Sequence, residues 1–200
     1  MRMKEDHMKN GQLKPGYNLQ LGVEGEYIVG AHICSERSDE LALLGLLERI
    51  ETGCGIRHRN VVADAGYESG ENYKRLESRG QAAYIKPQNY ERLKTKKYRN
   101  NAYLRDNMPY DARADTYTCP AGKTFERIGE TKRKNKSGFE ATVTIYECLG
   151  CEGCAQKALC TRAKGNRRME VSKDFLVLRQ ASLERISSDE GKTLRLNRSI

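Results

Sequence analysis

One aspartate lies where its side chain could bind a metal ion. Asp64 directly follows the short apolar run Asn60–Ala63, and a glycine comes two residues later. An apolar run of this length, bounded by turn residues, indicates a buried strand. Open sheets place their functional sites at the carboxyl ends of such strands. The alternative is an aspartate that only caps a turn, which the glycine at position 66 favours.

Five of the seven cysteines form a second group with chemical potential. They are Cys119, Cys148, Cys151, Cys154 and Cys160. Thiolates two residues apart can bind one tetrahedral Zn²⁺, and the binding stabilises a segment too polar to build a core. We therefore expect a zinc ribbon-like insertion with four of the five cysteines as ligands. An iron–sulfur cluster and free thiols are the alternatives. The remaining two, Cys34 and Cys54, are expected to be small buried hydrophobes.

The whole chain has a formal net charge of +9, and the positive charge is concentrated in its second half. Residues 1–85 hold 11 basic and 13 acidic side chains, whereas residues 86–136 hold 14 and 6. A basic surface favours a polyanion such as DNA. The residues expected to contact phosphates are Lys94, Lys96, Lys97, Arg99, Lys132, Arg133, Lys134 and Lys136. A solvated, partly disordered loop is the alternative.

The elements that must position Asp64 are predicted from hydrophobic periodicity. Two β-rich runs, 17–23 and 27–34, flank a Glu-Gly-Glu turn and predict a β-hairpin. Leucines three residues apart after Asp39 predict a helix that ends near Gly53.

The run before Asp64 is followed by a predicted helix from about Ser69 to Arg79 and by a strand at Ala82–Ile85. This strand–helix–strand order predicts parallel pairing, and the hairpin beside it makes the expected sheet mixed. Later in the chain we expect a short strand within 165–171 and a helix over 175–196 that breaks near Ser188.

Composition excludes two classes of protein. No run of 18 apolar residues is present, which excludes a membrane-spanning helix. No apolar segment follows Met1, so we expect no signal peptide. Cysteines without a secretory signal favour metal binding in a reducing compartment over disulfides.

The chain resembles the DDE transposases of bacterial insertion sequences, and within them the IS1182-type and IS4-like groups. The resemblance is carried by 8–20 (MKNGQLKPGYNLQ), 62–67 (VADAGY), the cysteine group and 195–200 (RLNRSI). It implies an α/β, ribonuclease H-like fold with a mixed sheet flanked by helices. It also implies a site of two aspartates and one glutamate that binds Mg²⁺, in which Asp64 is the second acid.

The chain departs from the family pattern at the other two acids. The family's first strand, with its aspartate, is missing here, and the final glutamate would follow residue 200. Asp6 and Glu190 are poor replacements, because Asp6 lies in a polar segment and Glu190 matches a non-catalytic acid of the family. We thus expect a partial catalytic core at 1–87, a basic, Cys-rich insertion at 88–174, and the start of a C-terminal helix at 175–200.

The resemblance therefore implies a fragment of a transposase that cuts and joins DNA by metal-dependent phosphoryl transfer and is inactive alone. We expect a bacterial cytoplasmic location, and pairing of two copies in the intact parent. The alternative function is a zinc-stapled nucleic-acid-binding protein without catalysis. A remnant that does not fold is a third possibility.

Overall fold

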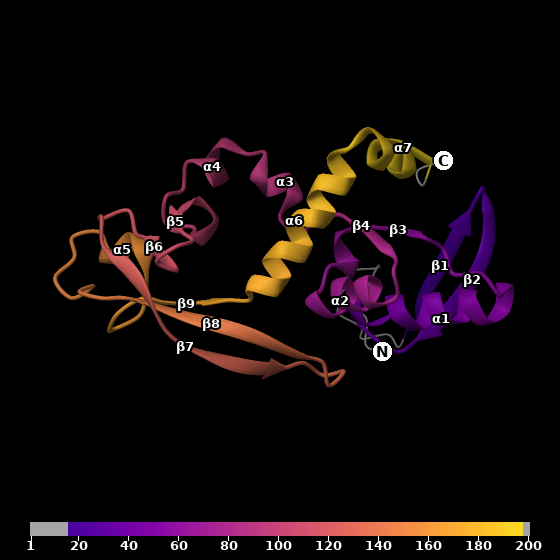
Figure 1. The fold of residues 1–200 in the computed structure, drawn as a ribbon, viewed down its shortest axis with the longest axis horizontal. Coiled ribbons are helices and arrows are strands. Elements are labelled where there is room, and N and C mark those ends of the chain that lie inside the picture. The colour runs from indigo at the N-terminus through magenta and orange to yellow at the C-terminus, as the bar shows by residue number, and fades with distance from the viewer. Residues whose placement is uncertain (1–15, 198–200) are drawn as a thin grey trace, which may run out of the picture. The chain divides into compact units, whose positions relative to one another are not determined.

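A computed structural model describes residues 16–197, and the chain divides into two compact units (Figure 1). The core unit comprises Met1–Gln88 and Val177–Ile200, and the Cys-rich unit comprises Asn89–Leu176. The functional roles that we assign to the three predicted segments remain predictions.

The core unit combines a hairpin, a parallel strand pair and helices. Its elements are β1 (Asn18–Glu24), β2 (Tyr27–Cys34), the 3-10 turn η1 (Asp39–Leu41), α1 (Leu43–Cys54), β3 (Asn60–Ala63), the 3-10 turn η2 (Ala65–Tyr67), α2 (Gly70–Ser78), β4 (Ala82–Ile85), the C-terminal part of α6 (Lys173–Ser187) and α7 (Asp189–Asn197). The break between α6 and α7 at Ser188 confirms the predicted interruption.

The predicted hairpin is confirmed, with β1 and β2 antiparallel and Gly22 opposite Gly30. A side chain at either glycine would collide with Ile50 of α1, so the two glycines let this helix pack directly on the hairpin (Figure 1). The predicted helix starts later than expected. Asp39 opens only η1, and α1 begins at Leu43.

The parallel pair β3–β4 is also confirmed. The helix between them starts where predicted, because the Ser69 hydroxyl accepts a hydrogen bond from the Asn72 amide at 3.1 Å. The described strands of this unit do not form the single mixed sheet that we expect from the sequence. They make two separate two-stranded sheets in this unit, because no strand within residues 16–197 hydrogen-bonds to both β1 and β3.

The Cys-rich unit contains a five-stranded antiparallel sheet in the order β5-β6-β7-β8-β9. Its elements are α3 (Tyr90–Leu93), α4 (Lys96–Arg99), η3 (Arg105–Asn107), β5 (Tyr110–Asp111), β6 (Thr116–Thr118), β7 (Thr124–Lys134), β8 (Glu140–Cys148), α5 (Lys157–Cys160) and β9 (Arg168–Val171). Phe125, Tyr146 and Val171 form its core together with three buried cysteines. The short strand predicted within 165–171 is β9. The basic segment 132–136, for which a solvated loop was the alternative, belongs to the long hairpin β7–β8.

No helix within residues 16–197 is long and apolar enough to cross a membrane. Cys54 is exposed and Cys34 is half-buried, so the expectation that both are buried is wrong.

A buried hydroxyl holds α6 against the outer edge of β4. The Ser182 side chain is fully buried. Its oxygen accepts a hydrogen bond from the Ile85 amide at 3.0 Å and lies 3.0 and 3.2 Å from the carbonyls of Ile85 and Ala83. It therefore satisfies backbone groups that an edge strand would leave unpaired.

We predict that Ser182→Ala destabilises the protein by about 1–3 kcal/mol, because a buried amide loses its acceptor. Ser187→Ala in the same helix is the control. That hydroxyl is exposed and bonds only to the Leu183 carbonyl within the helix, so the expected change is within about 0.5 kcal/mol. Chemical denaturation of both variants makes the measurement, and equal stabilities would contradict the role of Ser182.

Candidate functional site

Asp64 lies directly after β3, at its carboxyl end, with an exposed side chain. It is the N-cap of η2, and its Oδ1 accepts a hydrogen bond from the Gly66 amide at 2.9 Å. Asp64 thus caps a turn, as the alternative interpretation of this residue predicts. Capping and metal binding are compatible, because a carboxylate oxygen offers further lone pairs.

A second carboxylate, Asp39, lies beside Asp64 across the glycine of η2. A Cβ atom on Gly66 would lie 3.0 Å from Asp39 Oδ2 and 3.2 Å from Asp64 Oδ1. The two carboxylates therefore converge on one point although 25 positions separate them in sequence. The sequence does not single out Asp39, because no local pattern predicts this approach.

The segment after η2 is fixed by a buried ion pair. Glu68 is 4% exposed, and its Oε1 lies 2.8 Å from Arg179 Nε. Arg179 Nη2 donates to Oε2 at 2.9 Å, and the Gln88 amide donates to the same oxygen at 2.8 Å. The Tyr73 hydroxyl donates to Oε1 at 3.1 Å. Burial and the neighbouring Glu68 charge raise the pKa of Tyr73, so this donor stays protonated.

Of the two acids weighed as replacements, Glu190 does not lie beside Asp64. Glu190 lies beside Asn60, whose Nδ2 is 3.4 Å from Glu190 Oε1, and it also interacts with Tyr84. Asn60 begins β3, whereas Asp64 follows its end. Four residues of strand separate these positions by about 13 Å. Asp6 lies outside the described residues.

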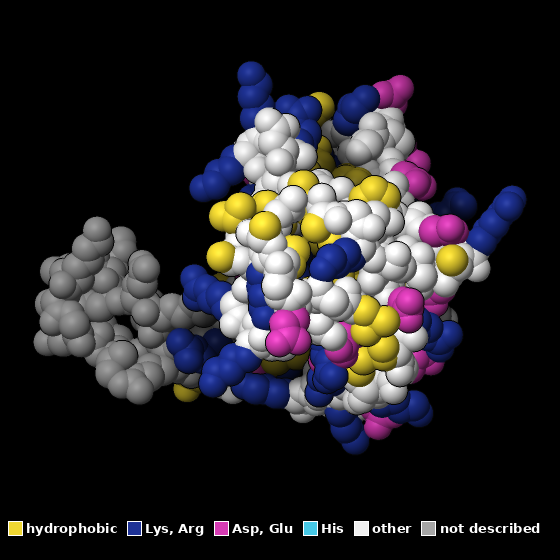
Figure 2. All heavy atoms as spheres, turned by 90° about the vertical axis from the view of Figure 1, so that its left-hand side faces the viewer, with side chains coloured by type: hydrophobic (Ala, Val, Ile, Leu, Met, Phe, Trp, Pro, Cys, Tyr) yellow, Lys and Arg dark blue, Asp and Glu magenta, His cyan; other side chains and the backbone are white. Residues whose placement is uncertain are grey.

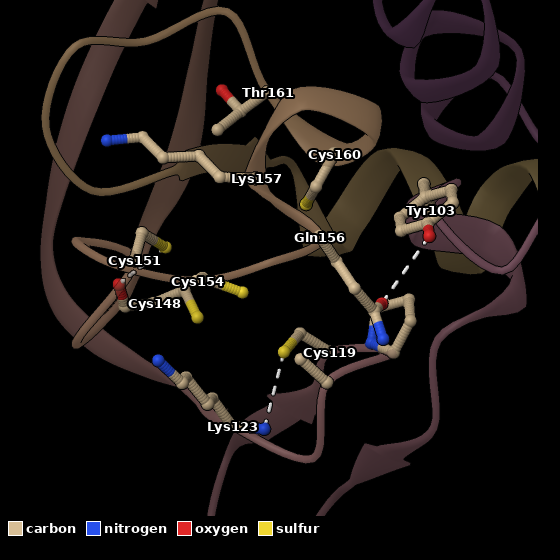
Figure 3. Close-up of a pocket in the computed structure, with 12 residues that line it drawn as sticks. Tyr103, Cys119, Lys123, Cys148, Cys151, Cys154, Gln156, Lys157, Cys160 and Thr161 are labelled. Atoms are coloured by element: carbon tan, nitrogen blue, oxygen red, sulfur yellow. Dashed lines mark hydrogen bonds between the residues drawn. The ribbon is translucent and has the colours of Figure 1, made fainter.

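The five cysteines line one pocket of the Cys-rich unit (Figure 3). Cys119, Cys148 and Cys151 are buried, whereas Cys154 and Cys160 are partly exposed. The turns between them depend on Gly150 and Gly153, with φ of 75° and 69°. This backbone conformation is one that glycine adopts without strain.

The thiols interact with one another and with N–H donors. Burial and the neighbouring thiols of Cys151 and Cys119 raise the pKa of Cys148 to about 12. The Lys123 amide donates to Cys119 Sγ at 3.3 Å, and the Arg167 guanidinium donates to Cys160 Sγ at 3.0 Å. Such donors stabilise negative charge on sulfur. As arranged within residues 16–197, no three His, Cys, Asp or Glu side chains form a group that could hold a metal ion.

All eight predicted phosphate-contacting residues are exposed. Figure 2 shows Lys and Arg side chains spread over one face of the molecule. Three of them have acidic partners: Lys94 with Glu91 at 3.2 Å, Lys132 with Glu140 at 3.9 Å, and Arg133 with Glu170. The others, for which no acidic partner occurs within the described part of the chain, are Lys96, Lys97, Arg99, Lys134 and Lys136. Three lie on or at the end of α4, and two lie at the tip of the β7–β8 hairpin.

Comparison with known proteins finds two matching family models, each described as a transposase DDE domain. One matches residues 1–149 and the other matches residues 118–200. Neither a curated protein nor a solved structure matches the chain. The first model covers more than half of the chain and includes both Asp39 and Asp64.

Proposed function

We propose that this chain, which belongs to the family of transposase DDE domains, contributes to metal-dependent cleavage and transfer of DNA strands. In this proposal Asp64 is one of the carboxylates that bind the catalytic metal. The observation that carries it is the exposed Asp64 carboxylate at the carboxyl end of β3, on a turn held by buried contacts.

Mg²⁺ is the metal that suits this position, because it prefers oxygen ligands and retains several waters. When bound, such an ion activates a water or a 3′-hydroxyl and stabilises the leaving oxygen. The chain's own contribution is orientation. The Gly66 amide fixes one oxygen of Asp64, and the Glu68–Arg179 pair fixes the segment that follows.

We further propose a ribonuclease H-like arrangement, in which β1–β2 and β3–β4 belong to one sheet joined by a further strand. The order hairpin, helix, strand, helix, strand supports it. Large apolar side chains of the hairpin that remain exposed support the same arrangement. Leu19, Val23 and Ile28 are 56%, 63% and 66% exposed, which is typical of a face that packs on another element.

Catalysis needs more than Asp64. Two metal ions that share ligands need further carboxylates beside Asp64, so we propose that the reaction depends on acids in addition to this one. We propose a bacterial cytoplasmic location for this reaction, and pairing of two copies in the intact parent stays a prediction. The match to transposase DDE domains does not favour the non-catalytic alternative.

We predict that Asp64→Asn weakens Mn²⁺ binding, used as a probe for Mg²⁺, by at least about tenfold, because the ligand loses its charge. Calorimetric titration of the full chain makes the measurement. Asp189→Asn is the control, since that carboxylate is exposed and lies in α7. Unchanged Mn²⁺ affinity in Asp64→Asn would contradict the proposal.

A structural Zn²⁺ in the Cys-rich unit is a second proposal. Its support is the donor set: five thiols line one pocket, and N–H donors approach three of their sulfurs. A bound cation would stabilise the thiolates and lower the raised pKa of Cys148. The ligands would be four of the five cysteines.

We predict that the purified chain contains one zinc per molecule by elemental analysis, and that Cys151→Ser loses the metal and much of its thermal stability. Cys54→Ser is the control, because that thiol is exposed in the core unit and should keep the zinc. Iron instead of zinc would support the cluster alternative. Neither metal, with all thiols titratable, would support free cysteines.

We also propose that the basic residues of the Cys-rich unit contact DNA phosphates. The support is that five of the eight carry charge without an acidic partner among the described residues. Tyr98 lies in α4 between Lys97 and Arg99. Nearby, the ammonium of the paired Lys94 is 4.1 Å from the Tyr90 ring centre.

We predict that DNA binding weakens steeply with salt, and that Lys134→Gln with Lys136→Gln reduces the slope of log affinity against log salt by about 1–2. The control is Lys132→Gln, a lysine near Glu140, which should reduce it less. Affinity that does not depend on salt would contradict phosphate contact.

A further inference from the structure

We propose that Asp39 is a positioning residue for Asp64, acting across Gly66 and through a buried amide network. This inference rests on the proposed function, because it concerns how the metal-binding carboxylate is held. Asp39 opens η1, and Asp64 caps η2. The two turns contact each other within the core unit.

Asp39 is held by two amide side chains from β1. The Asn18 and Gln20 amides donate to its Oδ1 at 2.9 and 3.0 Å. Gln20 also donates to Asn18 Oδ1 at 2.6 Å. These contacts fix the carboxylate in one orientation. Its second oxygen, Oδ2, accepts no hydrogen bond within the described part of the chain and faces Gly66.

Gln20 links Asp39 to the turn that carries Asp64. Its side chain is 4% exposed, and its Oε1 accepts a hydrogen bond from the Tyr67 hydroxyl. Tyr67 is the last residue of η2. A buried amide costs free energy unless its donors and acceptors are satisfied. Here both ends of Gln20 are used, and fully satisfied networks of this kind restrict motion.

A second buried amide makes the same connection through the backbone. Asn72 of α2 is 1% exposed, and its Nδ2 donates to the carbonyls of Glu40 and Tyr67, each at 2.8 Å. One carbonyl belongs to η1 and the other to η2. Two independent bridges therefore set the spacing between the turns that bear Asp39 and Asp64.

Because both carboxylates approach Gly66 closely, the spacing between the two turns is sensitive to a side chain added at this position. A methyl group there would lie 3.0 Å from Asp39 Oδ2 and 3.2 Å from Asp64 Oδ1, so both carboxylates would have to move by a few tenths of an ångström. Asp39 also keeps a negative charge near any cation on Asp64. In a water-like dielectric, one negative charge about 6 Å from a divalent ion strengthens binding of that ion by roughly a factor of ten.

The test compares Asp39→Asn and Gly66→Ala in the full chain, with Asp64→Asn as the reference. The probe is Mn²⁺ alone, and the readouts are its dissociation constant and the electron paramagnetic resonance line shape of the bound ion. We expect about tenfold weaker binding in Asp39→Asn, several-fold weaker binding in Gly66→Ala, and an altered line shape in both.

Two substitutions serve as matched controls. Asp189→Asn removes an exposed carboxylate of α7, and Gly53→Ala adds a methyl group where no atom lies within 4 Å. Both should bind Mn²⁺ like the unmodified chain. Melting temperatures of all variants separate a loss of the metal site from a loss of fold.

The possible outcomes separate the two proposals. If Asp64→Asn loses Mn²⁺ but Asp39→Asn and Gly66→Ala bind with unchanged affinity and line shape, Asp39 does not position Asp64 and the proposed function stands. If Asp39→Asn unfolds and Gly66→Ala stays folded with unchanged binding, the role of Asp39 is structural only. If Asp64→Asn itself binds normally, both proposals fail.

Discussion

A buried carboxylate four residues beyond Asp64 determines how the core unit closes. Glu68 is almost inaccessible to water, and a buried charge without a partner is strongly destabilising. Its cationic partner, Arg179, comes from α6, 111 positions later in the chain. The Cys-rich unit lies between them in sequence, so the core unit forms only when both of its segments meet.

The consequence for the site is that Asp64 lies between two fixed points. On one side β3 is paired with β4, whose outer edge is covered by Ser182 of α6. On the other side Glu68 is held by Arg179 and Tyr73. The exposed carboxylate thus projects from a turn whose flanks are buried and hydrogen-bonded, as preorganised binding of a metal requires.

The Cys-rich unit follows a different physical principle. Its core is small and includes three cysteines, together with Phe125 and Tyr146. The strand β7 is mostly exposed, and Phe125 is its only buried residue. A metal ion that joins the thiols would supply the cohesion that so few apolar side chains give only in part.

Local signals in the sequence predicted the elements around Asp64 well. The apolar run before it, the serine that caps α2 and the break at Ser188 each depend on neighbours only a few residues away. The approach of Asp39 to Gly66 depends instead on β1, whose amides lie 19 and 21 positions from Asp39. No periodicity or spacing encodes such a contact, so it was missed.

The β7–β8 hairpin was missed for another reason. Lysine and arginine dominate its tip, and this charge is typical of a solvated loop, whereas the strand signal lies further on, in Thr142, Val143, Thr144 and Ile145. β-branched residues in succession favour a strand, and the segment from Asn135 to Gly138 is a turn. Those two signals together would have predicted the hairpin.

An anomalous diffraction map from crystals of the full chain grown with Mn²⁺ would locate the bound ion. We expect a peak within coordination distance of the Asp64 carboxylate, on the side of the turn that faces Asp39. A map with no peak at Asp64 when Mn²⁺ is saturating, or with peaks only at other carboxylates, would contradict the assignment of Asp64 as a metal ligand.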